Sequence, residues 1–234
     1  MDIILIPGLW LDGSSWERVT PALLKAGHRV TAITPPGHDG ADPRHVTYAD
    51  LVAAIVTEID SASGPAMLVG HSAACAAAWA AADRRPDRTA RVLLLGGFPI
   101  PDGMMLLDGF ETNDDGVLPF PGWQPFDGPD IADLSEGDRA WLEGHMSPAP
   151  ADYALGTQSL GNPKRYDVPV VMVCPEFSEA DVRNWISQGF APVSELPKVR
   201  HLAYVELDSG HWPQASRPDD LARVLLAEAD PTHS

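Results

Sequence analysis

The 234-residue chain is poor in cysteine and in basic residues. It has 2 cysteines, Cys75 and Cys174, and 16 Lys and Arg against 33 Asp and Glu, a formal net charge of −17. Two cysteines do not make a disulfide framework, and we expect both to be buried as small hydrophobic residues. The acidic balance argues against nucleic acid or an anionic membrane surface as partner, because both require clustered basic side chains.

Long apolar runs and metal-binding motifs are also missing. No apolar run approaches the roughly 20 residues that span a bilayer. The apolar residues 3–6 follow Met1 and Asp2 without a basic segment and are too few for a signal-peptide core. No metal-ligand spacing or phosphate-binding loop occurs. These absences favour a cytoplasmic protein without a metal site.

Apolar segments alternate with helical patterns along most of the chain. We expect strands at 3–6, 28–33, 66–69, 91–95, 168–174 and 203–207. We expect helices at 16–26, capped by Ser14 or Ser15, at 48–59, capped by Thr47, and at 74–82, 179–188 and 218–229. This alternation predicts an α/β fold with a mostly parallel sheet of about six strands and helices on both faces.

Residues 98–167 differ from the rest of the chain. They are dense in Pro, Gly and Asp, and only 135–146, with Ser135 as cap, has the pattern of a helix. A weakly structured stretch of this length between two strands is too long for a simple connection. We therefore expect an α/β core at 1–97 and 168–234, and a small irregular lid at 98–167 that has no core of its own.

Residues 64–82 carry the strongest functional signal. An apolar run is followed by the turn Gly70-His71-Ser72-Ala73-Ala74 and by an Ala-rich segment that favours helix. A strand, a tight turn with a central serine and a helix form a nucleophile elbow, in which small flanking residues let strand and helix approach. The usual pattern ends in Gly, so Ala74 is a variant. Alternatively, Ser72 only caps the helix.

A serine nucleophile needs an adjacent base, usually a histidine. His211 lies in a Gly-flanked loop after the strand expected at 203–207, where open α/β sheets place ligands. It also fits the order of elbow enzymes, in which the acid and then the histidine follow the serine. The weaker candidates are His38, His145 and His201.

The acid that would orient the histidine is the most open assignment. Glu176 follows the strand expected at 168–174 and could stabilise the charged imidazole. It could instead only hold its loop. The alternatives are Asp102, Asp208 and, less favoured, Asp181.

An acyl-transfer intermediate needs two N–H donors for its oxyanion. We expect one at Ala73, after the serine, and one at Leu9, in the turn that Gly8 allows after the first strand. The candidate substrate-binding residues are Trp10, His71, Met104 and Trp123, although His71 is also interpreted as structural. Aromatic and methionine side chains in the lid indicate an apolar or aromatic substrate, unless they simply pack the lid onto the sheet.

Taken together and in this order, the motifs resemble the α/β-hydrolase superfamily over nearly the whole chain. The matching segments are 6–10 with Trp16, 36–38, 70–74, 210–213 and 217–218. The opening segment is similar to the plant methylesterase and hydroxynitrile-lyase branch. The resemblance implies a Ser–His–acid triad, an oxyanion hole at Leu9 and Ala73, a lid and no cofactor. Two departures stand out: the family's first hairpin is missing, and its usual acid position falls on Ser178.

We therefore expect a serine hydrolase that cleaves a small carboxylic ester, thioester or lactone through an acyl-enzyme on Ser72, with His211 as general base. Because the acid is open, the same pair could serve a cofactor-free lyase, oxygenase or perhydrolase. A ligand-binding protein with a vestigial site is a third possibility, which the intact pair argues against. The partner would be a small molecule, and the chain a monomer or homodimer.

Overall fold

A six-stranded sheet forms the centre of the computed structural model, which describes residues 1–230. Its strands lie in the order β2-β1-β3-β4-β7-β8, and every neighbouring pair is parallel. Their bounds are β1 Asp2–Ile6, β2 Arg29–Ala32, β3 Ala66–His71, β4 Thr89–Leu95, β7 Val170–Cys174 and β8 Leu202–Glu206. The predicted α/β fold with about six strands is confirmed.

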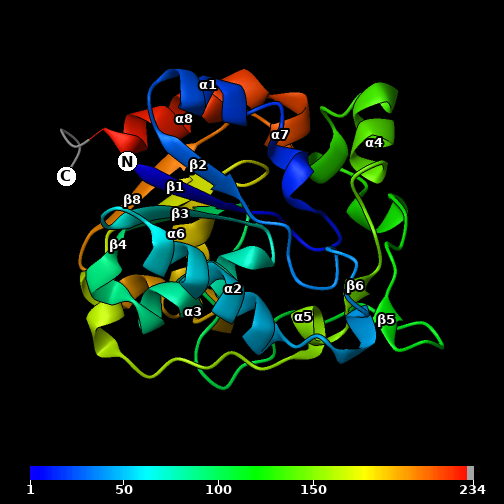
Figure 1. Ribbon diagram of the computed structural model, residues 1–234, viewed down its shortest axis with the longest axis horizontal. Coiled ribbons are helices and arrows are strands. Elements are labelled where there is room, and N and C mark those ends of the chain that lie inside the picture. Colours follow the sequence, from blue (N-terminus) through cyan, green and yellow to red (C-terminus); the bar gives the residue numbers. More distant parts are fainter. Residues whose placement is uncertain (231–234) are drawn as a thin grey trace.

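Helices cover both faces of the sheet (Figure 1). The upper face in the figure carries α1 (Thr20–Lys25) and α8 (Pro218–Ala229). The other face carries α2 (Tyr48–Ser61), α3 (Ala74–Arg84) and α6 (Glu179–Ser187). Alternate strand residues point to opposite faces, so Ile3 packs with α8 and Ile4 packs with α2 and α3. Burial on both faces explains why the inner strands β1, β3, β4 and β7 are mostly apolar, whereas the edge strands β2 and β8 are partly exposed.

Local sequence explains the ends of several helices. The Thr47 hydroxyl caps α2 by accepting the Asp50 amide, and the Asp50 carboxylate accepts the Thr47 amide, as in a capping box. The predicted helix at 16–26 is wrong in its first part: α1 begins at Thr20, so Pro21 stands in the first turn, where its missing N–H is not needed. Residues 13–16 form a 3-10 turn whose cap is the Asp12 side chain rather than Ser14 or Ser15.

Much of the 98–167 segment, including α4, β5 and β6, lies beside the sheet on the right in Figure 1, and its last part runs back along the bottom to the left. It contains a two-stranded antiparallel ribbon of β5 (Val117–Leu118) and β6 (Ala149–Pro150). It also contains α4 (Glu136–Glu143), which Ser135 caps as predicted, α5 (Asp152–Leu155) and several 3-10 turns. No helix within residues 1–230 is both long and apolar enough to cross a membrane.

The 98–167 segment is bonded to the loop that follows β1. The Trp10 indole donates to the Leu118 carbonyl at 3.1 Å, the Ser147 amide to the Trp10 carbonyl at 3.0 Å and the Asp12 amide to the His145 carbonyl at 3.2 Å. Its apolar side chains also join those of the core. One cluster unites side chains from both parts: Leu11, Ile131, Leu134, Leu142, Trp212 and Ala215. Both kinds of contact dock the segment on the carboxyl edge of the sheet.

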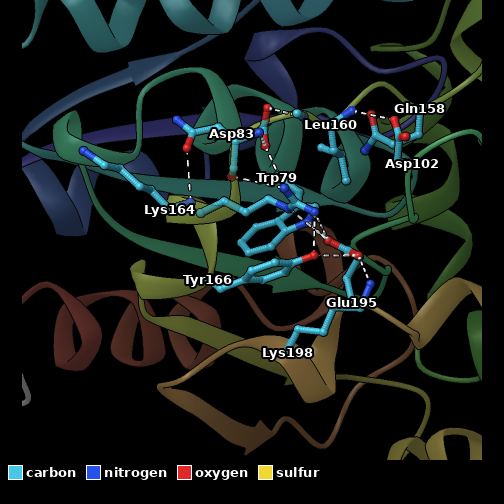
Figure 2. A network of polar contacts seen from close by, with 12 residues as sticks. Trp79, Asp83, Asp102, Gln158, Leu160, Lys164, Tyr166, Glu195 and Lys198 are labelled. Carbon is cyan, nitrogen blue, oxygen red and sulfur yellow. Dashed lines mark hydrogen bonds and ion pairs between the residues drawn. The ribbon is translucent and has the colours of Figure 1, made fainter.

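A buried ionic network holds the end where the 98–167 segment returns to the sheet (Figure 2). The Arg165 guanidinium pairs with Asp83, from α3, at 3.0 Å and with Glu195 at 2.9 Å, and all three side chains are buried. Glu195 also accepts from the Trp79 indole at 3.2 Å. Asp83 further accepts the amides of Gly161 and Asn162, so the network fixes backbone as well as side chains.

Candidate active site

Ser72 stands at a strained turn between β3 and α3. Its φ is +55°, a conformation that non-glycine residues rarely adopt, and its amide donates to the Leu95 carbonyl at 2.8 Å. Neighbouring backbone leaves no room for side chains at two glycines. A Cβ on Gly70 would lie 2.7 Å from the Ala74 carbonyl, and one on Gly97 would lie 2.2 Å from the Ser72 carbonyl. The turn thus has the geometry that the sequence predicts for a nucleophile elbow.

Three side chains that are distant in the sequence form one hydrogen-bonded chain. Ser72 Oγ lies 2.8 Å from His211 Nε2, and His211 Nδ1 lies 2.7 Å from Glu176 Oε1. Glu176 follows β7 and His211 follows β8, so both groups reach the carboxyl edge of the sheet where β3 ends. The His211 and Glu176 side chains are each 13% exposed. The geometry therefore brings together the three residues that the sequence singled out.

The surroundings of His211 favour its charged form. Burial lowers the pKa of its imidazole, but the Glu176 carboxylate, through its charge and hydrogen bond, and Asp130 outweigh this and raise it above 6.5. Glu176 Oε2 is buried without a hydrogen-bond partner in residues 1–230, so the hydrogen bond of this carboxylate is the one between Oε1 and His211. With the proton on Nδ1, facing Glu176, the neutral ring offers Nε2 as acceptor to the serine hydroxyl.

The other candidate acids have different partners. Asp102 accepts the Leu160 amide at 2.9 Å and so holds the 98–167 segment. Asp181 bonds to Ser178 in the capping box of α6, which also accounts for Ser178 at the position of the family's usual acid. Asp208 is exposed. Among these carboxylates, only Glu176 contacts His211.

The other candidate histidines also lie elsewhere. His38 Nδ1 is 2.7 Å from the Ser147 hydroxyl, and His145 Nδ1 is 2.7 Å from the Trp141 carbonyl. His201 is exposed, and its carbonyl accepts the Val170 amide. None of the three contacts Ser72.

His71 holds the backbone of the site. Its Nε2 donates to the His211 carbonyl at 2.8 Å, and its Nδ1 faces the Gln214 amide nitrogen at 3.4 Å. Burial, with a smaller contribution from His211, lowers the pKa of His71 to about 3, so the ring stays neutral. A Cβ on Gly8 would lie 2.7 Å from His71 Nδ1, so a residue with a side chain at position 8 would collide with the imidazole. These contacts favour the structural interpretation of His71, although it also borders the cavity.

Two backbone amides beside Ser72 are available to a ligand. Leu9 and Ala73 both border the cavity, and neither amide donates a hydrogen bond within the described residues. α3 begins directly after Ala73, so the partial positive charge of the helix N-terminus lies at the same place. Trp10, next to Leu9, has φ +71°, and it and Ser72 are the two non-glycine residues of 1–230 with positive φ. Backbone strain is thus concentrated around this cavity.

The cavity has a volume of about 240 Å³ and lies between the strand ends and the 98–167 segment. Its apolar wall consists of Trp10, Phe98, Ile100, Leu106, Leu107, Phe110, Phe126 and Trp212. Met104 and Trp123, predicted to bind substrate, do not line it. Trp123 packs edge-on against Trp212, and Met104 packs half-buried against the main core. Without periodicity in 98–167, the sequence did not show which apolar residues face inward.

Among the described residues, the cysteines and the other possible metal ligands do not form a second centre. Both cysteines are buried and free, as predicted, and burial raises the pKa of the Cys174 thiol to about 12 and that of Cys75 further. Within residues 1–230 there is no group of three His, Cys, Asp or Glu side chains that could hold a metal ion. The cavity at Ser72 is therefore the candidate active site.

Comparison with known proteins agrees with this architecture. The sequence model of the alpha/beta hydrolase family matches residues 3–224. Methylesterase 9 of Arabidopsis thaliana is 25% identical over 263 residues, which cover 97% of each chain. Epoxide hydrolase B of Mycobacterium tuberculosis is 34% identical over 104 residues, 42% of this chain, but the match spans only 28% of that protein.

A solved structure shows the same arrangement of elements. It is an extracellular alpha/beta-hydrolase from a Paenibacillus species, whose description notes homology to tobacco salicylic acid binding protein 2. It superposes with a TM-score of 0.78 at 18% identity, covering 97% of this chain and 98% of that one. Because the family match extends over nearly its whole length, the chain belongs to the alpha/beta hydrolase family.

Proposed function

We propose that this hydrolase cleaves a small carboxylic ester, thioester or lactone through an acyl-enzyme on Ser72. The main support is the hydrogen-bonded series Ser72–His211–Glu176, with contacts of 2.8 and 2.7 Å. Ser72 faces the cavity beside the Leu9 and Ala73 backbone amides, which donate no hydrogen bond within the described residues. A hydroxyl, a base and an orienting acid in this geometry are what nucleophilic acyl transfer requires.

In the first half-reaction, Ser72 Oγ attacks the substrate carbonyl while its proton passes to His211 Nε2. The amides of Leu9 and Ala73 donate to the oxyanion, and a donor of this kind contributes about 10²–10³-fold in rate. Glu176 stabilises the imidazolium and keeps its Nδ1 proton in place. The intermediate collapses when the C–O or C–S bond breaks and His211 returns the proton to the leaving oxygen or sulfur.

In the second half-reaction, water replaces the leaving group. His211 Nε2 takes a proton from the water as its oxygen attacks the acyl carbon, and the same two amides support the second oxyanion. Breakage of the ester bond to Ser72 returns the proton to Oγ and releases a carboxylic acid. The small volume and apolar wall of the cavity favour a small apolar or aromatic acyl group.

An acyl-enzyme assay tests this function directly. Rapid mixing with 4-nitrophenyl acetate should release a burst of one nitrophenolate per active site, followed by slower turnover. A serine-directed fluorophosphonate should add once, at Ser72, as located by peptide mass analysis. Ser72→Ala should abolish both signals, whereas Ser187→Ala, which alters an exposed serine on α6, should change neither.

The same assay separates this proposal from its alternatives. A lyase or an oxygenase that uses the same residues as acid and base would show no burst. Folded protein whose Ser72 stays unmodified would exclude the acyl-enzyme mechanism altogether.

A further inference from the structure

Asp130 brings a carboxylate from the 98–167 segment to the catalytic cavity. It lies in the 3-10 turn Pro129–Ile131, and its backbone carbonyl accepts the His211 amide at 2.8 Å. A Cβ on Gly210 would lie 2.3 Å from that carbonyl, so the glycine permits the close approach. The turn that carries Asp130 is therefore held against the loop that carries His211.

Apart from the His211 imidazole, which must be neutral to act as the base, the charge of Asp130 has no cationic neighbour at the site. Asp130 lines the cavity together with Ser72 and His211, and the lining includes no Lys or Arg. Within residues 1–230 its carboxylate forms no ion pair within 4.0 Å. Burial raises the pKa of Asp130, and the Glu176 carboxylate adds to the rise, whereas His211 opposes it. Its charge therefore acts on both neighbours in a partly buried space.

The hydrogen-bonded chain is complete without Asp130. His211 Nε2 is hydrogen-bonded to Ser72 Oγ, and His211 Nδ1 is hydrogen-bonded to Glu176 Oε1. Apart from these three residues, His71 and Asp130 itself, the side chains that line the cavity are apolar, so the acyl group of a substrate is the remaining partner for the Asp130 carboxylate. At short range and at an effective dielectric constant near 20, such a charge changes the affinity for a charged ligand by about tenfold or more.

We propose that Asp130 determines specificity by charge: it disfavours esters with an anionic acyl group and favours esters whose acyl group carries a cation or a hydrogen-bond donor. The proposal rests on the esterase function above and names the substrate class within it. Repulsion at this position is a means of rejecting the wrong substrate, as well as of attracting the right one. It also assists release of the carboxylate product, which becomes anionic only after hydrolysis.

Three 4-nitrophenyl esters of similar size test the proposal. The 4-(trimethylammonio)butyrate and 5,5-dimethylhexanoate esters have the same shape and differ in charge, and the adipate monoester carries an anion. The wild type should prefer the cationic ester to the anionic one in kcat/KM by at least about tenfold. Asp130→Asn should reduce this preference to within about threefold, with the rates for both charged esters expressed relative to the neutral ester in each variant.

Two further variants control for net charge and for folding. Asp127→Asn removes the same charge from an exposed position three residues away and should leave the preference unchanged. Asp130→Ser, a second neutral variant that keeps the backbone carbonyl, should repeat the effect of Asp130→Asn. The proposal would be overturned if the ratio of kcat/KM for the cationic ester to kcat/KM for the anionic ester were the same in the wild type and in both Asp130 variants.

Binding measurements keep the test independent of turnover. The corresponding 4-(trimethylammonio)butanamide and adipamate should quench the fluorescence of Trp10 and Trp212, which line the cavity. Asp130→Asn should lower the ratio of the adipamate Kd to the 4-(trimethylammonio)butanamide Kd by at least about threefold. If all three esters resist hydrolysis but this ratio changes as expected, the esterase function fails and the role of Asp130 stands. An unchanged ratio overturns that role whether or not the esters are cleaved.

Discussion

The sheet and the 98–167 segment meet at one cavity but are built in different ways. The sheet is enclosed by two apolar clusters, and the loops at its carboxyl edge present Ser72, Glu176 and His211. The 98–167 segment has little regular structure and is held by backbone hydrogen bonds, aromatic contacts and a buried ionic network. Reactive groups thus come from the loops of the sheet, and most of the apolar wall of the cavity comes from the irregular part.

This difference suggests that chemistry and selectivity can be changed separately. Strand ends hold reacting groups to within a fraction of an ångström, as proton transfer requires. The segment contributes rings and aliphatic side chains, such as Leu106, Phe110 and Phe126, whose exchange alters shape more than geometry at the serine. Changes to the sheet should therefore affect kcat, and changes to the segment should affect KM, selectivity or stability.

The largest effect is expected where the sheet carries the acid. Glu176→Gln should lower kcat/KM for 4-nitrophenyl acetate by about 10³–10⁴-fold, because an amide neither stabilises the imidazolium nor fixes the tautomer. Asp102→Asn changes the rival acid, which bonds to the Leu160 amide, and should stay within about threefold of the wild type. A large loss in Asp102→Asn with little in Glu176→Gln would reverse the assignment.

The pH dependence of the same variant gives a second measurement. The general base must be neutral, and the pKa of His211 is raised above 6.5, so kcat/KM should rise with pH through a midpoint above 6.5. Removing the Glu176 charge removes the main cause of the rise, so the midpoint in Glu176→Gln should move to lower pH. A midpoint that stays in place or moves upward would contradict the contact seen here.

The ionic network at the end of the 98–167 segment should matter for stability rather than for chemistry. Arg165→Met leaves Asp83 and Glu195 buried without their cation and should lower the free energy of unfolding by about 3–5 kcal/mol in urea titrations. Activity below the transition should change little, because none of these three residues lines the cavity. The exposed pair Arg200–Asp167 is the control, and Arg200→Met should cost at most about 1 kcal/mol.

A smaller loss of stability is expected from crowding at the serine turn. Gly97→Ala places a Cβ 2.2 Å from the Ser72 carbonyl and 2.8 Å from Cys75 Sγ, so the turn must shift. We expect a loss of about 1–3 kcal/mol in stability and a fall in kcat of at least about tenfold. Gly161→Ala meets no atom within 4 Å and should leave both quantities near wild type.

The smallest effect is expected in the wall of the cavity. Phe126→Leu removes a ring that packs on Trp10 and Trp212, and it should raise KM for an aromatic ester by about three- to tenfold with kcat nearly unchanged. Phe190→Leu, at an exposed aromatic position outside the cavity, should leave KM unchanged. Equal shifts in the two variants would show that the ring at 126 does not contact substrate.

The sequence predicted the sheet and the serine turn because both depend on local patterns. Apolar runs mark buried strands, and the small residue Gly70 allows the close backbone contact at Ser72. Neither Asp130 nor Gly97 could be predicted, because their roles come from contacts with residues far away in the chain. Met104 and Trp123, predicted to bind substrate, do not line the cavity for a related reason: a segment without periodicity does not reveal which side chains point inward.

The hydrogen bond between the His211 amide and the Asp130 carbonyl limits how the cavity can be re-engineered. It couples the turn Pro129–Ile131 to the loop of the catalytic base, so enlarging the cavity there would misplace the imidazole. Redesign for bulkier acyl groups should begin at Leu106, Leu107 and Phe110, which border the cavity from another part of the segment. Libraries that vary these positions and spare residues 129–131 should retain a larger fraction of active clones.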